Sequence, residues 1–225
     1  MNAAEAVFLE KGIPQTTMAE IARAANVSKG ALYLVFVRKE ELYLAIAQRC
    51  LNELIELWNE VERNPALDGF NRFKALLEAY LDYALRYRDR FRVALGWSSA
   101  EYAVSLDTET FTSQSPAATE YREALQDSFR PGFEALELGK KDGSVRPDLD
   151  TATTLFHVWN GTVGVLMAIY GSEKTSAFMP AQVDYAEMLR QHVAALLMNV
   201  RRAPEAIEQI PDLCAKAHRQ SDPDD

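Results

Sequence analysis

Several features are scarce in this sequence. It has two cysteines in 225 residues, Cys50 and Cys214, which are too few for a disulfide framework and form no paired metal-ligand motif. Its ten glycines and nine prolines exclude collagen-like and low-complexity chains. No apolar run is long and uninterrupted enough to predict a membrane span, and no basic segment precedes an apolar core near the start. A cytoplasmic protein without membrane contact is expected.

Motifs for catalysis and for metal binding are also missing. The sequence contains no glycine-rich phosphate loop, no nucleophile elbow and no paired Cys/His signature. Its three histidines, His157, His192 and His218, are isolated and lack the close spacing of metal ligands. We therefore expect no enzymatic activity, no metal and no cofactor.

Positive charge is scarce overall but unevenly distributed. The formal net charge is -9, which argues against a protein whose whole surface coats nucleic acid. Residues 1–50, however, hold six Lys/Arg and five Asp/Glu, a net charge of +1, so the remainder carries -10. The acidic surplus is interpreted as a solvated surface, with preference for a cationic ligand as the alternative.

Helical periodicity dominates what is present, and no alternating strand pattern occurs, so the sequence predicts an all-α fold of about nine to ten helices. Three short helices are expected at residues 3–11, 17–25 and 29–35. Thr17 and Glu20 have the spacing of a capping box, and Ser28 is a natural N-cap for the third helix.

A long helix is then expected from near Arg38 to about Val61, ending at Asn64-Pro65. Further helices are predicted at residues 69–87, 89–106, 116–139 with a kink at Pro131, 151–170 and 180–202. This pattern suggests a small module at 1–48, a larger body at 49–202 and a C-terminal tail at 203–225 that contains a possible short helix and is then disordered.

The second and third short helices have the composition of a helix-turn-helix. Ala22, Ala25 and Val27 are small enough to let the two helices cross closely. The third short helix, at residues 29–35, is expected to enter a DNA major groove. It would expose Ser28, Lys29, Gly30, Tyr33 and Leu34. The bare backbone of Gly30 and the methyl group of Ala31 would permit close approach to base edges.

The module resembles the N-terminal domain of TetR-family transcriptional regulators. The resemblance rests on Phe8-x-x-x-Gly12, Thr16-Thr17-Met18-x-x-Ile21-Ala22 and Val27-Ser28-Lys29-Gly30-Ala31-Leu32-Tyr33-x-x-Phe36-x-x-Lys39-Glu40-Glu41-Leu42. It implies a homodimer that binds double-stranded DNA through the first three helices, a fourth helix leading to a ligand-binding body, and a dimer interface built from the last two large helices.

Carried over by position, the resemblance implies that Lys29, Gly30, Ala31 and Leu34 face bases. It implies that Thr17, Tyr33 and Lys39 contact phosphates. The sequence departs from the usual family pattern at Leu34, Val35 and Arg38, where the apolar pair would contact thymine methyl groups or pack inward. Members usually begin about ten residues earlier, so the natural chain is expected to be longer at its start.

Two further groups of residues are predicted in the body. Aromatic residues are candidates for lining a small-molecule pocket, with an ordinary core role as the alternative: Phe91, Trp97, Tyr102, Phe129, Phe133, Phe156 and Trp159. Two apolar helical stripes, which the resemblance would place at a dimer interface and which could equally be buried within one subunit, contribute Val163, Leu166, Tyr170, Leu189, Val193 and Leu196.

Together these observations predict a ligand-responsive transcriptional regulator, most often a repressor in this family, that binds a palindromic operator and is released by an effector. The alternative is a DNA-silent helical sensor or partner-binding protein that has kept the scaffold.

Overall fold

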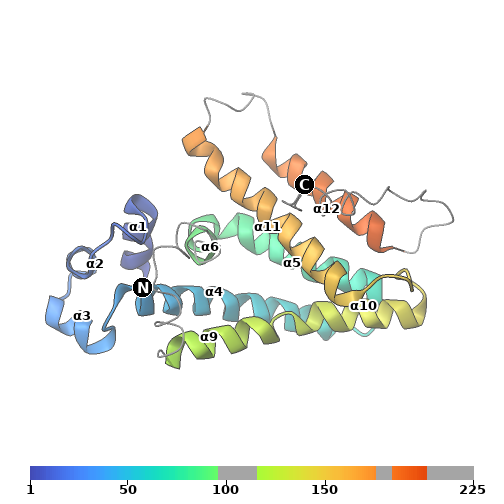
Figure 1. Ribbon diagram of the computed structural model, residues 1–225, viewed down its shortest axis with the longest axis horizontal. Coiled ribbons are helices and arrows are strands. Elements are labelled where there is room, and N and C mark those ends of the chain that lie inside the picture. Colours follow the sequence, from blue (N-terminus) through green and yellow to red (C-terminus); the bar gives the residue numbers. More distant parts are fainter. Residues whose placement is uncertain (96–115, 176–183, 202–225) are drawn as a thin grey trace, which may run out of the picture.

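The computed structural model describes residues 1–95, 116–175 and 184–201, which form ten helices. In these ranges the only strand-like pairing is an isolated bridge between Val145 and Arg201. The predicted all-α fold with an N-terminal helix-turn-helix is confirmed. Figure 1 shows an elongated molecule with three short helices at one end and the larger helices at the other.

The N-terminal unit consists of α1 (Asn2–Lys11), α2 (Met18–Ala24) and α3 (Lys29–Val35). Helix α1 ends because Gly12 takes φ 77°, a left-handed conformation that glycine adopts without strain. The apolar core of the N-terminal unit also includes residues from later helices. Its buried members are Ala4, Val7, Phe8, Ile13, Met18, Ile21, Leu42, Tyr43, Ile46 and Val93.

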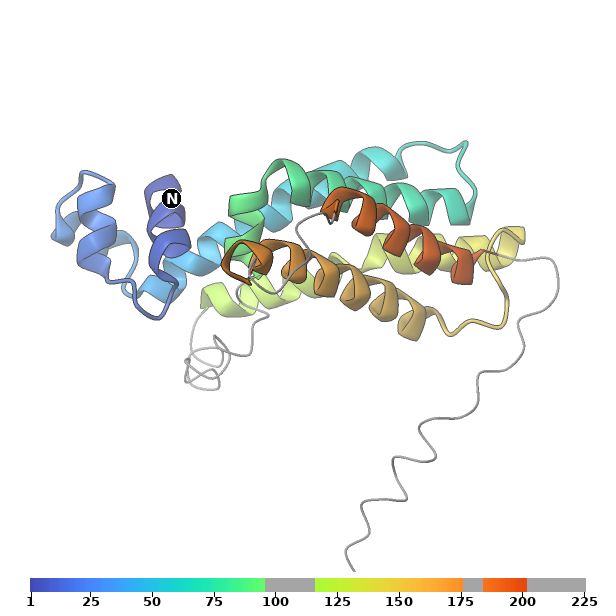
Figure 2. The same ribbon diagram turned by 90° about the horizontal axis from the view of Figure 1, so that it is seen from above.

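Helix α4 (Lys39–Glu62) connects this unit to the body. Its first turns contribute Tyr43 and Ile46 to the N-terminal core, and its later turns contribute Cys50 and Leu54 to the core of the body. One continuous helix therefore belongs to two cores. Figures 1 and 2 show this helix running from the N-terminal unit into the body. The predicted boundary after residue 48 lies inside this helix, between the residues of the two cores.

The body contains six further helices in the described ranges. They are α5 (Gly69–Arg86), α6 (Arg88–Leu95), α9 (Pro116–Asp127), α10 (Arg130–Asp142), α11 (Thr151–Thr175) and α12 (Tyr185–Val200). The start of α5 lies directly on the end of α10, where a Cβ atom on Gly69 would be 2.0 Å from the Gly139 nitrogen. Glycine at position 69 allows this backbone contact, and a Cβ atom on Gly139 would instead be 2.3 Å from the Val145 side chain.

The predicted single helix at 116–139 is wrong. The chain forms α9 and α10 with a break at Ser128-Phe129, where the Ser128 hydroxyl donates a hydrogen bond of 2.6 Å to the Leu125 carbonyl. Pro131 lies in the first turn of α10, where its missing N–H leaves no hydrogen bond unmade. The proline thus begins a helix instead of bending one.

Helix α11 is strongly apolar. Within the described ranges, its segment Thr151–Tyr170 is long and apolar enough to cross a membrane by length and composition alone. A helix packed in a soluble protein passes the same criterion, and α11 packs against α10 and α12 with Val158 and Leu166 buried. Its opposite side exposes Phe156 and Met167.

Candidate nucleic-acid interface and body cavity

The turn between α2 and α3 is fixed by local hydrogen bonds. Asn26 takes φ 54°, a left-handed conformation that asparagine tolerates better than most residues. The Val27 amide donates to the Ala22 carbonyl at 3.0 Å, and the Ser28 hydroxyl accepts from the Ala31 amide at 3.0 Å. Ser28 therefore acts as the predicted N-cap and sets the direction of α3.

Helix α3 contributes no buried residue to the protein. Leu34 is 88% exposed and Val35 is 70% exposed, so neither packs inward. The Lys29 ammonium lies 5.6 Å from the centroid of the Tyr33 ring, one helical turn away. An outward face that combines this cation and aromatic ring with two large apolar residues is unusual on a soluble surface, and it leaves the helix free to enter a groove.

The capping box at the start of α2 is present. The Glu20 amide donates to the Thr17 hydroxyl at 3.3 Å, and Glu20 accepts from the Thr17 amide at 2.9 Å. Lys11 on α1 donates to the same carboxylate, and this hydrogen bond, together with those from Thr17, lowers the pKa of Glu20 to about 2. The Thr17 hydroxyl is exposed but donates to Glu20, so its contact with a phosphate stays a prediction.

Lys39 is bound to the N-terminal unit through its ammonium group. The Nζ atom donates to the Pro14 carbonyl at 2.7 Å and to the Thr16 carbonyl at 3.0 Å. Lys39 therefore fastens the first turn of α4 to the loop between α1 and α2. One of its three N–H groups remains for another acceptor, so the predicted phosphate contact also stays a prediction.

The segment between α3 and α4 adds an exposed apolar residue and an exposed cation to this surface. Val37 is exposed beside Leu34 and Val35, and Arg38 is exposed without a side-chain hydrogen bond as the N-cap of α4. The Glu41 carboxylate caps this helix, accepting from the Val37 amide at 2.8 Å. The sequence signal was the cation at a position where a capping residue is usual.

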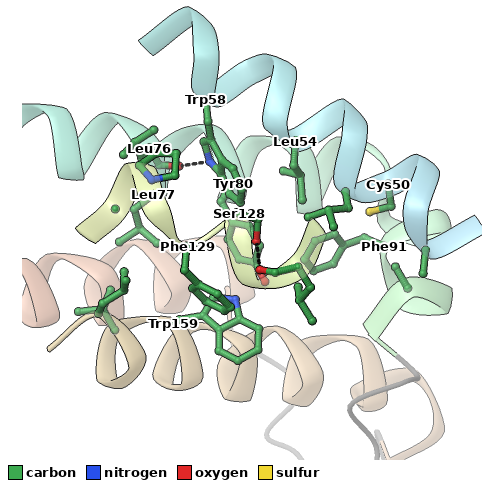
Figure 3. A pocket seen from close by; sticks show the side chains of 18 of the residues that line it. Cys50, Leu54, Trp58, Leu76, Leu77, Tyr80, Phe91, Ser128, Phe129 and Trp159 are labelled. Atoms are coloured by element: carbon green, nitrogen blue, oxygen red, sulfur yellow. Dashed lines mark hydrogen bonds between the residues drawn. The ribbon is translucent and has the colours of Figure 1, made fainter. Parts of the chain in front are cut away.

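The body contains a partly open cavity of about 140 Å³ between α4, α5, α6, α9, α10 and α11 (Figure 3). Its walls are mainly aromatic and aliphatic, and they consist of Ala47, Cys50, Leu51, Leu54, Trp58, Phe73, Leu76, Leu77, Tyr80, Phe91, Ala94, Tyr121, Leu125, Ser128, Phe129, Pro131, Gly132, Leu155, Val158 and Trp159.

Three of the predicted pocket residues line this cavity, namely Phe91, Phe129 and Trp159. Phe133 and Phe156 do not, because they are 43% and 47% exposed on the outer sides of α10 and α11. Trp97 and Tyr102 lie outside the described residues. Sequence reasoning missed Trp58, Tyr80 and Tyr121 because helical spacing does not show which face of a helix meets a void.

Helix α6 connects the cavity wall to the N-terminal unit. Phe91 lines the cavity, whereas Val93 packs in the N-terminal core, and the Tyr43 hydroxyl donates to the Ala94 carbonyl at 3.0 Å. On another side, the Arg90 guanidinium pairs with Glu53 of α4 at 2.7 Å and with Glu5 of α1 at 3.6 Å. Movement of α6 would therefore change contacts both in the cavity wall and in the N-terminal unit.

The residues predicted at a dimer interface lie mostly inside the subunit. Leu166, Tyr170, Leu189, Val193 and Leu196 are buried within the chain, and Val163 is half-buried. Apolar stripes indicate burial but do not identify the partner, and here α11 and α12 bury much of theirs against each other and the body. The outward side of this helix pair exposes Phe156, Met167 and Met198, and an added Cβ on Gly164 would meet nothing within 4 Å.

Comparison with known proteins identifies transcriptional regulators as relatives of this chain. Residues 1–46 match the family of bacterial regulatory proteins called the tetR family. The chain is 31% identical over 150 residues to the HTH-type transcriptional repressor KstR2 of Rhodococcus jostii, covering 67% of this chain and 68% of that protein.

Solved structures show the same fold. The ketosteroid transcriptional regulator KstR2 of Mycobacterium tuberculosis is similar with a TM-score of 0.65 and 19% identity, over 90% of this chain and 93% of that one. AibR, crystallised with isovaleryl coenzyme A and operator DNA, is similar with a TM-score of 0.62 and 19% identity, over 87% of this chain and 94% of that one.

Proposed function

The chain belongs to the TetR family of DNA-binding transcriptional regulators and is not an enzyme, and on that premise we propose that it is a cytoplasmic repressor that binds a palindromic operator as a homodimer and is released by a small-molecule effector. The repressor assignment is supported by the name of the Rhodococcus relative. The observation that carries the DNA contact is that α3 has no buried residue and projects from one end of the molecule.

In this proposal α3 is the recognition helix. Lys29, Gly30, Ala31 and Leu34 face bases, with Lys29 directed at guanine and Leu34 at a thymine methyl group. Tyr33, Thr17 and Lys39 lie beside the sugar-phosphate backbone, where contacts fix position without reading sequence. Ser28 holds the first turn of the helix in place. Arg38, the exposed cation at the start of α4, adds a further phosphate contact.

The proposed dimer uses the outward side of α11 and α12. The exposed Phe156, Met167 and Met198 form an apolar surface that a second copy would cover. Val163 and Leu166 then pack beneath this surface, inside the subunit, and are not part of the proposed interface. Dimerisation is needed because two recognition helices must enter successive major grooves, about 34 Å apart.

The proposed effector site is the body cavity. AibR was crystallised with both an acyl thioester of coenzyme A and operator DNA, and a ligand that acts on DNA binding is proposed for this chain by analogy. Occupation of the cavity would displace Phe91 and with it α6, whose other contacts reach Glu5 of α1 and Tyr43 of α4. Ligand and operator would then each weaken the binding of the other by the same coupling free energy.

A mobility-shift titration of the full chain against DNA from upstream of its own gene tests the proposal. Specific retardation is expected, with a steep loss of affinity as salt rises. The matched comparison is Leu34→Ser, which is exposed and supports no packing, against Leu85→Ser, an exposed position on α5. Equal binding by both variants, or no specific complex with the parent protein, would favour the DNA-silent sensor.

A further inference from the structure

We propose that the body cavity takes an uncharged, apolar ligand group about the size of one six-membered ring and that it rejects carboxylate and ammonium groups of the same size. The inference rests on the proposed function, because it names the chemical class of the effector. It goes further by excluding charge from the part of the ligand that enters the cavity.

The first argument is the composition of the wall. Of the twenty described residues that line the cavity, none is acidic or basic. The ion pair between Glu53 and Arg90, whose residues neighbour the lining residues Leu54 and Phe91 in sequence, is itself outside the lining set. A charged ligand group would leave water without meeting an opposite charge, which is strongly unfavourable. The acidic surface of the protein therefore does not indicate a cationic ligand here.

The second argument is that two of the polar groups in the wall already have hydrogen-bond partners within the protein. The Trp58 indole N–H donates to the Leu76 carbonyl at 3.0 Å, and the Ser128 hydroxyl donates to the Leu125 carbonyl at 2.6 Å. The dashed lines in Figure 3 show both bonds. The Ser128 oxygen can still accept one hydrogen bond. One hydroxyl group on an otherwise apolar ligand is consistent with this wall.

The third argument comes from the titratable groups that face the cavity. Burial raises the pKa of the Cys50 thiol to about 11 and that of the Tyr121 hydroxyl to about 12. Burial also raises the pKa of Tyr80. In each case the largest cause is that the charged form of the group would lose hydration on burial. A carboxylate or ammonium group placed among these residues would meet the same penalty.

The size of the ligand group follows from the volume. The cavity measures about 140 Å³, and a dry apolar cavity of about 150 Å³ in another protein binds benzene. Aromatic rings from Trp58, Phe91 and Trp159 contribute to the walls, and rings pack favourably edge-to-face with a second ring. The ring could be a free molecule or the acyl end of a larger thioester whose charged part stays outside.

The test uses the full chain and four compounds of nearly equal size: toluene, benzyl alcohol, benzoate and benzylammonium. Thermal unfolding is followed at about pH 7, where the last two compounds are charged. Toluene and benzyl alcohol are expected to raise the melting temperature with increasing concentration, as ligands of the native state do. Benzoate and benzylammonium are expected to leave it unchanged. A rise with either charged compound, or no rise with the neutral ones, overturns the proposal.

A pair of variants locates the site. Leu125→Trp adds volume at a half-buried position in the cavity wall, whereas Leu57→Trp adds the same volume at a half-buried position of α4 outside the lining set. Only Leu125→Trp is expected to abolish the shift caused by toluene. If both variants keep that shift, the compound binds elsewhere and the proposal fails. The wild-type comparison of the four compounds decides the matter even if a variant does not fold.

Two additional measurements are made. The first distinguishes a free ring compound from an acyl thioester, and the second distinguishes failure of the proposed ligand class from failure of the proposed regulatory function. Benzoyl-CoA raising the melting temperature more than toluene, with free CoA inactive, would identify an acyl thioester; a response to toluene alone would identify a free ligand. Operator binding is measured in parallel. Stabilisation by a charged compound together with operator release refutes the ligand class but keeps the regulator, whereas absence of operator binding refutes the proposed function.

Discussion

The Arg90 guanidinium of α6 lies 2.7 Å from the Glu53 carboxylate of α4. The same carboxylate accepts a hydrogen bond of 2.6 Å from the Tyr83 hydroxyl of α5, so three helices meet at one group. Arg90 also reaches Glu5 of α1, which pairs with Arg49. These polar contacts join α6 to α1, α4 and α5. Val93 of α6 adds an apolar contact with the N-terminal core.

Replacing Arg90 with Gln is expected to weaken communication between effector and operator. The partly buried carboxylates would lose their charge-assisted partner, lowering the free energy of unfolding by about 1–3 kcal/mol. The control is Arg86→Gln, at an exposed position on α5. Urea unfolding and operator titration with and without effector are the measurements. An undiminished effector response in a destabilised Arg90 variant would show that α6 transmits through its apolar contacts alone.

The two lysines near α3 are expected to act differently. Lys29→Ala should cost about 1–3 kcal/mol on one base pair of the operator and little on unrelated DNA. Lys39→Ala should weaken binding to all sequences and reduce the salt slope by about one unit. Because Lys39 also holds the Pro14 and Thr16 carbonyls, its variant should lose thermal stability as well. Binding titrations on specific and scrambled DNA separate these effects, and identical losses would refute the division of roles.

Acid is expected to destabilise the N-terminal unit through Glu20. Its pKa is lowered from 4.5 to about 2, first by the hydrogen bond from Lys11. A lowered native pKa means that its stabilising contribution is complete above pH 4.5 and is lost as the pH falls toward 2. Glu20→Gln should therefore reduce stability at neutral pH and flatten the dependence in that window. Melting curves across the window are compared with Glu10→Gln; parallel curves for wild type and Glu20→Gln would contradict the assignment.

Introducing a charge on the outward side of α12 is expected to separate the proposed dimer. Met198 is 71% exposed, so Met198→Glu should not disturb the folded subunit but would place a buried charge in each half of a symmetric interface. Sedimentation is expected to show monomers and weakened operator binding. The control is Leu85→Glu on α5. A variant that sediments as the wild-type protein does would move the interface away from this surface.

In the candidate site, the helix ends are predictable from neighbouring residues, whereas the contacts between distant residues are not. Thr17, Ser28 and Gly12 fix helix ends by hydrogen bonds or backbone conformation within a few residues, so the positions of α1, α2 and α3 were predicted nearly to the residue. The exposure of Leu34 does not follow from the sequence, since an apolar residue on a short helix can pack inward or outward. The Lys39 ammonium finds carbonyl partners 23 and 25 residues earlier in the chain, and no local pattern encodes them.

In the body, the amphipathic helices and the points where most of them begin are predictable from local patterns, because capping residues, helix-breaking residues and the apolar period act over one or two turns. The sequence also carries the helix-turn-helix motif. Which apolar faces meet each other depends on how the helices pack. Leu166 and Leu189 are buried within the subunit, Phe133 and Phe156 face outward, and Trp58 and Tyr80 face a cavity. The reason is physical: the hydrophobic effect buries apolar area without specifying its partner, and only the packing of whole helices selects one.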